Sequence, residues 1–239
     1  FIDITERYAA EAQRKEFSAN VSHELKTPLT AIAALSELIA DGTAKDADVR
    51  PFAGKIQKQA RRLIDMIDDI IKLSEFDEEN VPREFARFSL YDTAEAVIDS
   101  LAEKAEERNV SVELRGDPRL SVAANLRMTD ELLYNLVDNA IKYNRDGGGV
   151  TVELSEDETS VRISVRDTGI GIPPEHLGRI FERFYRVDKS RSKKTGGTGL
   201  GLSIVKHVAE LHGGHVEVES QENVGTAITC VFKKYPQPQ

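Results

Sequence analysis

Two stretches in the first third of the chain carry apolar residues at helical spacing. In the first, steps of four and three connect one series of positions: Val21, Leu25, Pro28, Ile32, Leu35 and Ile39. The second has a similar series, with Pro51 expected as the first helical residue: Phe52, Ile56, Gln59, Leu63, Met66, Ile70 and Leu73. Because such steps place side chains on one face of an α-helix, the pattern predicts a helical hairpin that turns after Gly42.

The apolar stripes of this hairpin are wider than one hairpin can cover. Ile64, Ile67 and Ile71 extend the second stripe sideways. A second copy of the chain would supply the missing apolar partner, so the pattern predicts a homodimer held by a four-helix bundle. Upstream of Phe17 the stripe fades, and a stutter or a different element is expected to begin there.

The pattern changes after residue 76. Residues 77–84 read DEENVPRE, an acidic stretch with a proline, and are expected to form a hinge. Beyond it the sequence predicts helices near 90–109, 129–143 and 200–212, and strands near 150–154, 161–165, 216–219 and 227–232. Strands that pair as hairpins, with helices between them, indicate an α+β layered sandwich. The expected domains are therefore residues 1–76 and residues 85–235.

A histidine stands on the polar side of the first predicted helix. His23 is two residues from an apolar stripe position on either side, so at about 100° per residue it points nearly opposite the stripe and faces water. A neutral imidazole can act as a nucleophile; Glu24 is its neighbour, and Thr27 lies one turn further on the same face. Apolar positions continue in register past Pro28, which predicts a kinked helix rather than a terminated one. On geometry alone, an ordinary solvated histidine is the alternative.

A pair of asparagines shares one face of the predicted helix over residues 129–143. Asn135 and Asn139 are four residues apart, and most positions around them are apolar. Their amide oxygens suit Mg²⁺, which prefers oxygen ligands and can carry phosphates. Lys142 and Tyr143 extend this helix end toward the place where phosphate charge would lie. A pair of solvated asparagines is the alternative.

The strand pattern near residues 161–165 continues in parity to a carboxylate. Asp167 would therefore lie on the apolar face at a strand end, where an unpaired carboxylate is costly to bury. An adenine amino group would satisfy it, because an ionised carboxylate only accepts hydrogen bonds. Gly169 and Gly171 follow and provide a turn where backbone can approach a flat base. An ordinary strand-end turn is the alternative.

A glycine-rich segment runs directly into the last predicted helix. Residues 195–202 read TGGTGLGL, and backbone amides at a helix N-terminus can cradle phosphate, although the segment matches neither the P-loop nor the dinucleotide fingerprint. Between this segment and the earlier glycines, a long stretch is expected to form a mobile lid with basic side chains: Arg179, Arg183, Arg186, Lys189, Arg191, Lys193 and Lys194. A solvated charged loop is the alternative to a phosphate clamp.

Several of these segments together resemble the sequence boxes of two-component sensor histidine kinases. Residues 17–32, FSANVSHELKTPLTAI, resemble the H-box of the dimerisation and histidine phosphotransfer domain. Residues 135–144, 167–171, 181–184 and 197–201 resemble the N, G1, F and G2 boxes of the kinase's ATPase domain, in that order. The resemblance spans nearly everything from Phe17 to Phe232. It implies a Bergerat-type sandwich that binds Mg-ATP beneath the lid.

The resemblance also implies roles for the matched residues. His23 would accept the phosphoryl group, Glu24 would assist its deprotonation, and Thr27 would help to position water when the same domain dephosphorylates its partner. The asparagine pair would contact Mg²⁺ and Asp167 would bind the adenine amino group. The other residues expected around the nucleotide are Lys142, Tyr143, Gly169, Gly171, Arg186, Gly197, Thr198, Gly199, Leu200 and Gly201.

The resemblance implies an enzyme that phosphorylates His23 from ATP and transfers the group to a response-regulator aspartate, with phosphatase action on that regulator also expected. Two rivals remain at this point. One is an ATP-driven conformational ATPase of the same sandwich family, which gives no reason for the H-box. The other is a non-catalytic dimeric scaffold.

Composition and charge exclude several further classes of protein and of site. The chain is 40% hydrophobic and 31% charged, typical of a soluble globular protein, and its formal charge of −9 argues against a nucleic-acid face. The single cysteine, Cys230, excludes an internal disulfide and favours a reducing cytoplasm. No apolar run approaches the roughly 20 residues that cross a bilayer. Because residues 1–6 resemble the exit strand of a PAS sensor, residues 1–10 are expected to end an upstream sensor or linker, in a parent protein of the bacterial plasma membrane.

Overall fold

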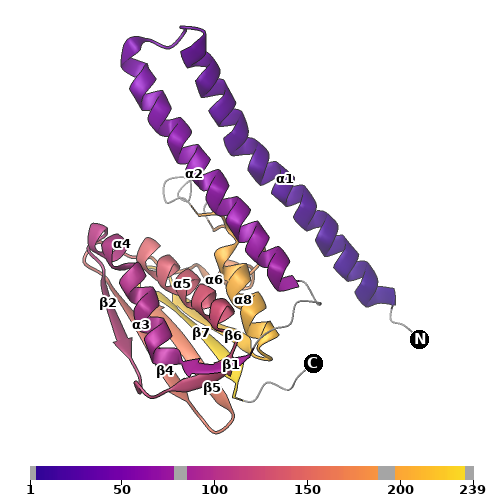
Figure 1. Cartoon of the computed structure of the whole chain (residues 1–239), viewed down its shortest axis with the longest axis vertical. Coiled ribbons are helices and arrows are strands. Elements are labelled where there is room, and N and C mark those ends of the chain that lie inside the picture. Colours follow the sequence, from indigo (N-terminus) through magenta and orange to yellow (C-terminus); the bar gives the residue numbers. More distant parts are fainter. Residues whose placement is uncertain (1–3, 78–84, 188–196, 235–239) are drawn as a thin grey trace. The chain divides into compact units, whose positions relative to one another are not determined.

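The computed structural model describes residues 4–77, 85–187 and 197–234, with side chains from Phe17 onward (Figure 1). The chain divides into two compact units. One holds residues 1–72 together with residues 196–198, and the other holds residues 73–195 and 199–239. None of the described helices is both long and apolar enough to cross a membrane.

The two long helices of the predicted hairpin are α1 (Ile4–Ala40) and α2 (Asp46–Asp77), and the first unit includes α1 and the part of α2 up to Lys72 (Figure 1). As predicted, α1 continues through Pro28, whose side chain is buried. Near the proline, the Thr27 and Thr30 hydroxyls donate hydrogen bonds to the carbonyls of His23 and Lys26, at 3.2 Å and 2.8 Å.

Two predictions about the ends of these helices are wrong. Residues 4–6 are helical rather than the exit strand of a preceding sensor, and among the described residues 4–16 no different element begins, because α1 is continuous there. The other alternative, a stutter within the helix, stays a prediction. A strand needs a pairing partner, whereas residues 4–16 are rich in Ala, Glu, Arg and Lys, which favour helix without one. α2 begins at Asp46 rather than Pro51, because Asp46 and Asp48 complement the positive end of the helix dipole in the first turn.

Apolar side chains remain exposed along both helices of the hairpin. The exposed set combines stripe neighbours from α1 and α2: Leu29, Leu38, Ile64, Ile67 and Ile71. Scattered apolar residues are common on protein surfaces, but Ile64, Ile67 and Ile71 belong to the second predicted stripe, and Leu29 and Leu38 are next in sequence to stripe positions of the first. The exposure is consistent with the expected self-association.

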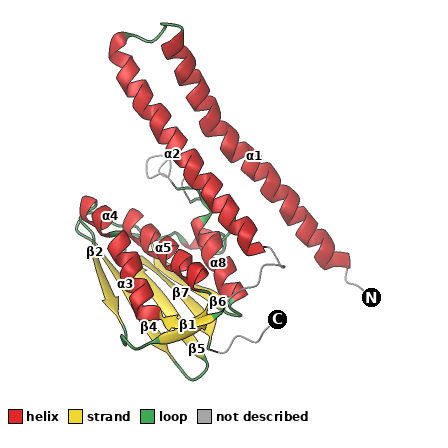
Figure 2. Ribbon diagram, viewed as in Figure 1, coloured by secondary structure: helices red, strands yellow, loops and turns green. Residues whose placement is uncertain are grey.

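The second unit is a sheet covered by helices on one face (Figure 2). Its helices are α3 (Leu90–Ser100), α4 (Ala102–Glu107), α5 (Leu126–Lys142), α6 (Pro174–Leu177) and α8 (Gly201–Leu211). Its strands are β1 (Ala86–Ser89), β2 (Ser111–Arg115), β3 (Ser121–Ala124), β4 (Gly149–Glu156), β5 (Ser160–Asp167), β6 (His215–Gln221) and β7 (Gly225–Lys233). This arrangement confirms the expected α+β sandwich.

The main sheet has five strands in the order β2-β4-β5-β7-β6, and β1 pairs with β3 in a separate antiparallel ribbon. β4–β5 and β6–β7 are antiparallel hairpins, as predicted, whereas β2 runs parallel to β4. Alternating residues of β4 and β5 face the helices and form the core: Val150, Val152, Leu154, Val161, Ile163 and Val165. The apolar face of α5 covers β4 and β5, and that of α8 lies on β6 and β7.

The sequence did not predict β1, β2 or β3, and it joined α3 and α4 into one helix. The missed strands have four or five residues, too few for a clear alternation. Between the helices, Leu101 adopts φ −101° and ψ 1°, which interrupts the helical path while its side chain stays buried.

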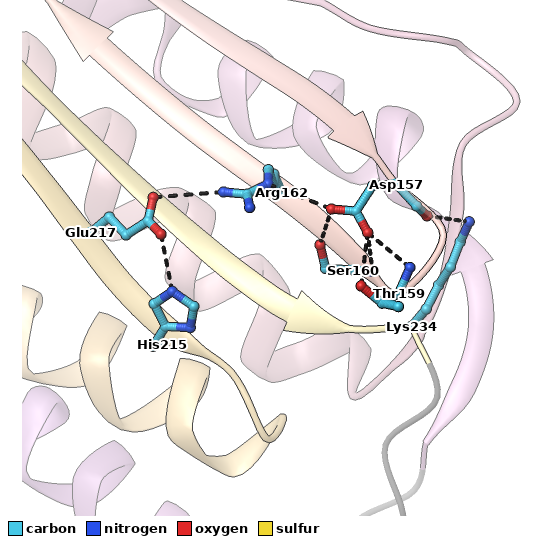
Figure 3. A network of polar contacts seen from close by, with 7 residues as sticks. All are labelled: Asp157, Thr159, Ser160, Arg162, His215, Glu217 and Lys234. Atoms are coloured by element: carbon cyan, nitrogen blue, oxygen red, sulfur yellow. Dashed lines mark hydrogen bonds and ion pairs between the residues drawn. The ribbon is translucent and has the colours of Figure 1, made fainter.

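A polar network ties the β4–β5 turn to the end of β7 and to β6 (Figure 3). Asp157 accepts hydrogen bonds from the Ser160 hydroxyl at 2.6 Å and from the backbone N–H groups of Thr159 and Ser160, both at 2.8 Å. These bonds hold the pKa of Asp157 well below its ordinary value. Lys234 Nζ lies 2.7 Å from Glu156 Oε2 and donates to the Asp157 carbonyl at 2.9 Å.

Candidate functional site

The His23 side chain faces solvent, as predicted. It lies on α1 and is 81% exposed. Its Nδ1 is 3.9 Å from Glu24 Oε1, and its backbone carbonyl accepts the Thr27 hydroxyl hydrogen bond. The structure therefore brings together the three H-box residues, with the carboxylate near the imidazole and Thr27 one turn away.

Glu24 also faces a cation on the other helix of the hairpin. Its Oε2 lies 3.5 Å from Arg62 Nη2 on α2, and the two side chains are 28% and 13% exposed. The carboxylate thus lies between an imidazole and a guanidinium. Sequence reasoning missed Arg62, because the facing of residues on two antiparallel helices depends on a register that one sequence does not reveal.

The asparagine pair lies on α5 against the first residue of α8. Asn135 Nδ2 donates to the Glu131 carbonyl at 2.8 Å and to Glu131 Oε1 at 3.0 Å. Its Oδ1 is turned toward Gly201, where an added Cβ would lie 2.5 Å from Asn135 Oδ1 and 3.7 Å from Asn139 Nδ2. The structure therefore joins the N-box and the G2-box glycine at one place, where a Cβ at residue 201 would force the Asn135 amide to shift.

The donor set at this place fits Mg²⁺. Glu131 holds the amide of Asn135 so that the oxygen, the atom a hard cation prefers, is directed toward Gly201. Among the described residues, no group of three or more His, Cys, Asp and Glu side chains could hold a metal ion. A cation here would therefore depend on amide oxygens, water and phosphate oxygens.

Cations gather at the C-terminal end of α5. Lys142 is only 8% exposed, and burial, with contributions from Lys104, Arg186 and Arg108, lowers its pKa to about 8 against the opposing effect of Asp138. Arg108 Nη1 donates to the Lys142 carbonyl at 2.8 Å, and Lys104 pairs with Asp138. So much positive charge near one buried ammonium suits a polyanion such as a triphosphate.

Asp167 ends β5 with its carboxylate half-buried, as predicted. Oδ1 accepts backbone N–H hydrogen bonds from Gly169 at 2.7 Å and from Thr226 at 3.3 Å. Burial raises the pKa of Asp167, and these two hydrogen bonds oppose the rise. Within the described parts of the chain both bonds use Oδ1, so Oδ2 is left to accept a hydrogen bond from a ligand.

The two glycines after Asp167 are needed by the protein's own backbone. A Cβ on Gly169 would lie 2.4 Å from the Tyr143 carbonyl oxygen, and a Cβ on Gly171 would lie 2.0 Å from that of Gln221. Gly171 also has φ +68°, in the left-handed region. Ile170 N–H donates to the Tyr143 carbonyl at 3.1 Å, so this turn is fastened to the end of α5.

The F-box and the G2-box meet through their backbones. Phe184 N–H donates to the Gly199 carbonyl at 2.9 Å, and both residues have positive φ, 66° and 81°. Leu200 is fully buried, and Arg186 is half-buried near Lys142.

Some of the expected residues make no described contact with the others of this site. Gly197 and Thr198 group with the helical unit, where the Thr198 hydroxyl donates to Asp69 Oδ2 on α2 at 2.7 Å. Arg179 pairs with Glu182 at 3.0 Å and lies over the Tyr185 ring, 4.3 Å from its centroid. The other basic residues expected in the lid, Lys189, Arg191, Lys193 and Lys194, lie outside the described residues.

Some residues of the site carry no sequence signal. Thr226 reaches Asp167 through the β5–β7 register, and Lys104 and Arg108 approach α5 only after the chain folds. Glu131 was detectable in principle, because it lies four residues before Asn135 on the same helix face.

Two family models match the chain, in the order that its two units suggest. Residues 13–79 match the His Kinase A (phospho-acceptor) domain. Residues 124–236 match the histidine kinase-, DNA gyrase B-, and HSP90-like ATPase. The first model includes His23, and the second includes Asn135, Asp167 and Gly201.

Individual proteins give the same picture. The sensor histidine kinase WalK of Bacillus subtilis (strain 168) is 37% identical over 230 residues, which cover 95% of this chain and 38% of WalK. The solved structure of histidine kinase ThkA in complex with the response regulator protein TrrA has a TM-score of 0.75 at 27% identity, covering 99% of this chain and 69% of that chain. The chain thus spans well under two thirds of WalK.

The sheet domain has a counterpart that it covers almost completely. A structure of the catalytic domain of ThkA is 32% identical, with a TM-score of 0.57, and the match covers 64% of this chain and 97% of that chain. The phospho-acceptor model matches the N-terminal part of the chain, the ATPase model matches the C-terminal part, and the ThkA catalytic domain is covered almost completely. The chain therefore belongs to the sensor histidine kinases of two-component systems.

Proposed function

We propose that this chain is the catalytic core of a kinase that moves the γ-phosphoryl group of ATP to His23 and then to an aspartate of a response-regulator receiver domain. The observation that carries the proposal is the 81% exposed His23 side chain, whose Nδ1 lies 3.9 Å from Glu24 Oε1. An imidazole open to solvent beside a carboxylate is a nucleophile with a proton acceptor at hand.

The distance from Nδ1 to Glu24 supports different tasks for the two ring nitrogens. Nδ1 is near Glu24, which leaves Nε2 to attack the γ-phosphorus. The Nε2–P bond forms as the bond from phosphorus to the β,γ-bridging oxygen breaks, and ADP leaves with that electron pair. The proton on Nδ1 passes to Glu24, so the product is a neutral ring that carries the phosphoryl group.

The residues of the sheet domain hold the nucleotide. Asp167 Oδ2 would accept a hydrogen bond from the adenine amino group beside the turn of Gly169 and Gly171, and the amide oxygens of Asn135 and Asn139 would hold Mg²⁺. Mg²⁺, when bound, neutralises phosphate charge. The remaining residues lie along the phosphates: Lys142, Tyr143, Arg186 and the glycine-rich segment 197–201.

Partners follow from the same chemistry. His23 and the nucleotide residues belong to different units, so the units approach for phosphorylation and separate for transfer to the regulator. Residues 77–84 serve as the hinge between the domains, at residues 1–76 and 85–235.

Exposed apolar residues on α1 and α2 support a homodimer, and Thr27 positions water for phosphatase action. The longer relatives support a parent anchored in the bacterial plasma membrane, with this chain in the cytoplasm.

The test is incubation of the chain with Mg²⁺ and γ-labelled ATP, followed by treatment of the protein with acid or base. Phosphohistidine is labile in acid and stable in base, so base-stable label on the protein is expected. His23→Gln should lose the label but still bind a non-hydrolysable ATP analogue with Mg²⁺ in calorimetry. Label that persists in His23→Gln would contradict the assignment of His23.

The two rivals give different results in the same experiment. A conformational ATPase would hydrolyse ATP steadily without labelled protein. A non-catalytic scaffold would show no binding of the nucleotide. Neither rival explains why an exposed histidine has a carboxylate neighbour that a second helix holds through Arg62.

A further inference from the structure

A buried histidine lies at the C-terminal end of α8, away from the phosphoryl acceptor. His212 is 1% exposed. Its Nδ1 lies 2.7 Å from the Val208 carbonyl oxygen, and its Nε2 accepts a hydrogen bond from the backbone N–H of Asn125 at 3.1 Å. Because a carbonyl only accepts, Nδ1 carries the proton and Nε2 carries the lone pair. Both nitrogens of a neutral ring are therefore used.

Aromatic contacts fix the plane of this ring. Phe232 on β7 stacks on His212 with centroids 4.6 Å apart and an interplanar angle of 9°, and Phe85 meets the ring edge-on at 5.2 Å. Phe85 is the first described residue after the segment 78–84. The imidazole is thus held by the sheet, by α8 and by the chain where it enters the domain.

The hydrogen-bond partner of His212 lies at the start of α5, the helix that carries Asn135 and Asn139. Asn125 is the N-cap of α5, and its side chain accepts a hydrogen bond from Met128 N–H at 3.0 Å. The backbone N–H of Asn125 is satisfied by the histidine, which comes from the end of α8. The start of α5 is therefore fastened to the end of α8.

The same two helices meet again at the nucleotide site. There the start of α8 touches α5, since the Gly201 backbone lies against Asn135 Oδ1. These two contacts, one at each end of α8, join it to the N-cap and to the middle of α5, so they fix both the separation and the sliding of the two helices. A helix moves nearly as a rigid rod, so loss of the contact at His212 shifts Asn135, Asn139 and Lys142 relative to the glycine at 201.

We infer that His212 is a positioning residue for nucleotide binding: through its Nε2 it sets α5 against α8 and so determines the geometry of the site. This inference rests on the proposed function and adds to it a residue that touches neither nucleotide nor Mg²⁺.

A matched pair of amide substitutions tests it. In His212→Gln the side chain is long enough to place an oxygen near the position of Nε2, and in His212→Asn it reaches only the position of Nδ1. The binding of a non-hydrolysable ATP analogue with Mg²⁺ to the full chain is measured by calorimetry, and folding is checked by circular dichroism. His212→Asn should weaken binding by about tenfold, and His212→Gln should restore most of the affinity.

The outcomes separate this inference from the proposed function. If the unmodified chain does not bind the analogue, the proposed function fails. If it binds and the folded His212→Asn variant binds equally well, only the positioning role is overturned. Equal losses in both variants would also overturn it, because a general packing role does not distinguish an acceptor at Nε2 from one at Nδ1.

A measurement on the unmodified chain covers the case in which His212→Asn does not fold. Coupling between two sites is reciprocal, so nucleotide should strengthen the contact that positions its site. Hydrogen exchange at the Asn125 amide should therefore slow when the analogue with Mg²⁺ is added. Exchange at this amide that stays unchanged at saturating analogue would overturn the inference.

Discussion

The helical hairpin and the sheet domain build their sites in different ways. The reactive part of the hairpin comes from one short segment, because His23, Glu24 and Thr27 all lie within residues 23–27 of α1. The nucleotide site joins residues that are distant in sequence, such as Asp167 with Thr226 and Asn135 with Gly201. A local site tolerates changes elsewhere in its fold, whereas a site assembled from distant segments depends on the packing of the whole domain.

The largest effect that this comparison predicts is at Asp167. Asp167→Asn keeps an oxygen for Gly169 and Thr226 but turns an NH₂ group toward the adenine amino group, so two donors face each other. The affinity for ATP should fall by about 10- to 100-fold. Calorimetry with a non-hydrolysable analogue measures it, and an affinity within a factor of two of the original would show that Oδ2 does not meet the base.

Two glycines, one in each region, give the next largest contrast. Gly171→Ala places a methyl group on the Gln221 carbonyl at a positive φ and should lower the free energy of unfolding by about 2 kcal/mol or more. Gly54→Ala in α2 meets no atom within 4 Å and should raise helix stability by about 0.5–1 kcal/mol. Urea unfolding of the two variants measures both. Equal changes in the free energy of unfolding of the two variants would contradict the contrast between the sheet domain and the hairpin.

The buried ammonium of Lys142 gives the sheet domain a pH dependence. Burial is the main cause that lowers its pKa from 10.5 to about 8 in the folded chain. Between these values the unfolded chain binds the additional proton, so the free energy of unfolding should rise with pH from about 8 to 10.5 and not below. Urea unfolding across this range checks the slope. Lys142→Met should remove this part of it, and an unchanged slope would contradict the assignment.

The hairpin should respond less to loss of its cross-helix pair. Arg62→Gln removes the cation that faces Glu24 Oε2, so the carboxylate loses one of the contacts that keep it beside His23. Because the pair is partly exposed, autophosphorylation should slow by only about two- to fivefold, and Arg62→Lys should recover part of the rate. Quantified label on His23 measures this, with analogue binding expected to stay unchanged. A loss of analogue binding would refute the local character of this site.

The smallest effect is expected at the turn between β4 and β5. The pKa of Asp157 is held low by its hydrogen bonds, so its stabilising contribution is present above its ordinary pKa and is lost as pH falls through the folded value. Asp157→Asn should lower the thermal midpoint slightly at pH 7, and the difference from the original chain should shrink in acid. A difference that grows in acid would contradict this sign.

The two regions also differed in how much the sequence revealed. The exposure of His23 followed from helical periodicity alone, because a single helix determines which of its side chains oppose one another. Asp167 at the end of a strand followed from alternation in the same way. Arg62 and Thr226 did not follow from the sequence, because their contacts depend on how two elements are aligned. The same limit explains the missed strands β1, β2 and β3, which are too short to show a period.

Local sequence rules gave a wrong start for α2 and an incomplete explanation of the two glycines after Asp167. A proline favours the first turn of a helix, yet α2 begins earlier, at Asp46, since acidic side chains there complement the helix dipole. The glycines after Asp167 were expected to serve a bound base. In the structure Gly169 and Gly171 are already required by the carbonyls of Tyr143 and Gln221, so their approach to a base stays a prediction.

The anchoring of Lys234 has a practical consequence for labelling. In the β5–β7 register Ser160 lies opposite Lys233 and Asp167 lies opposite Thr226, so the exit of β7 is at the far end of β5 from the Asp167 carboxylate. At about 3.3 Å per residue, the length of β5 separates them. A fluorophore or affinity tag joined after residue 234 would therefore leave from the opposite rim of the sheet and should not obstruct the proposed nucleotide site.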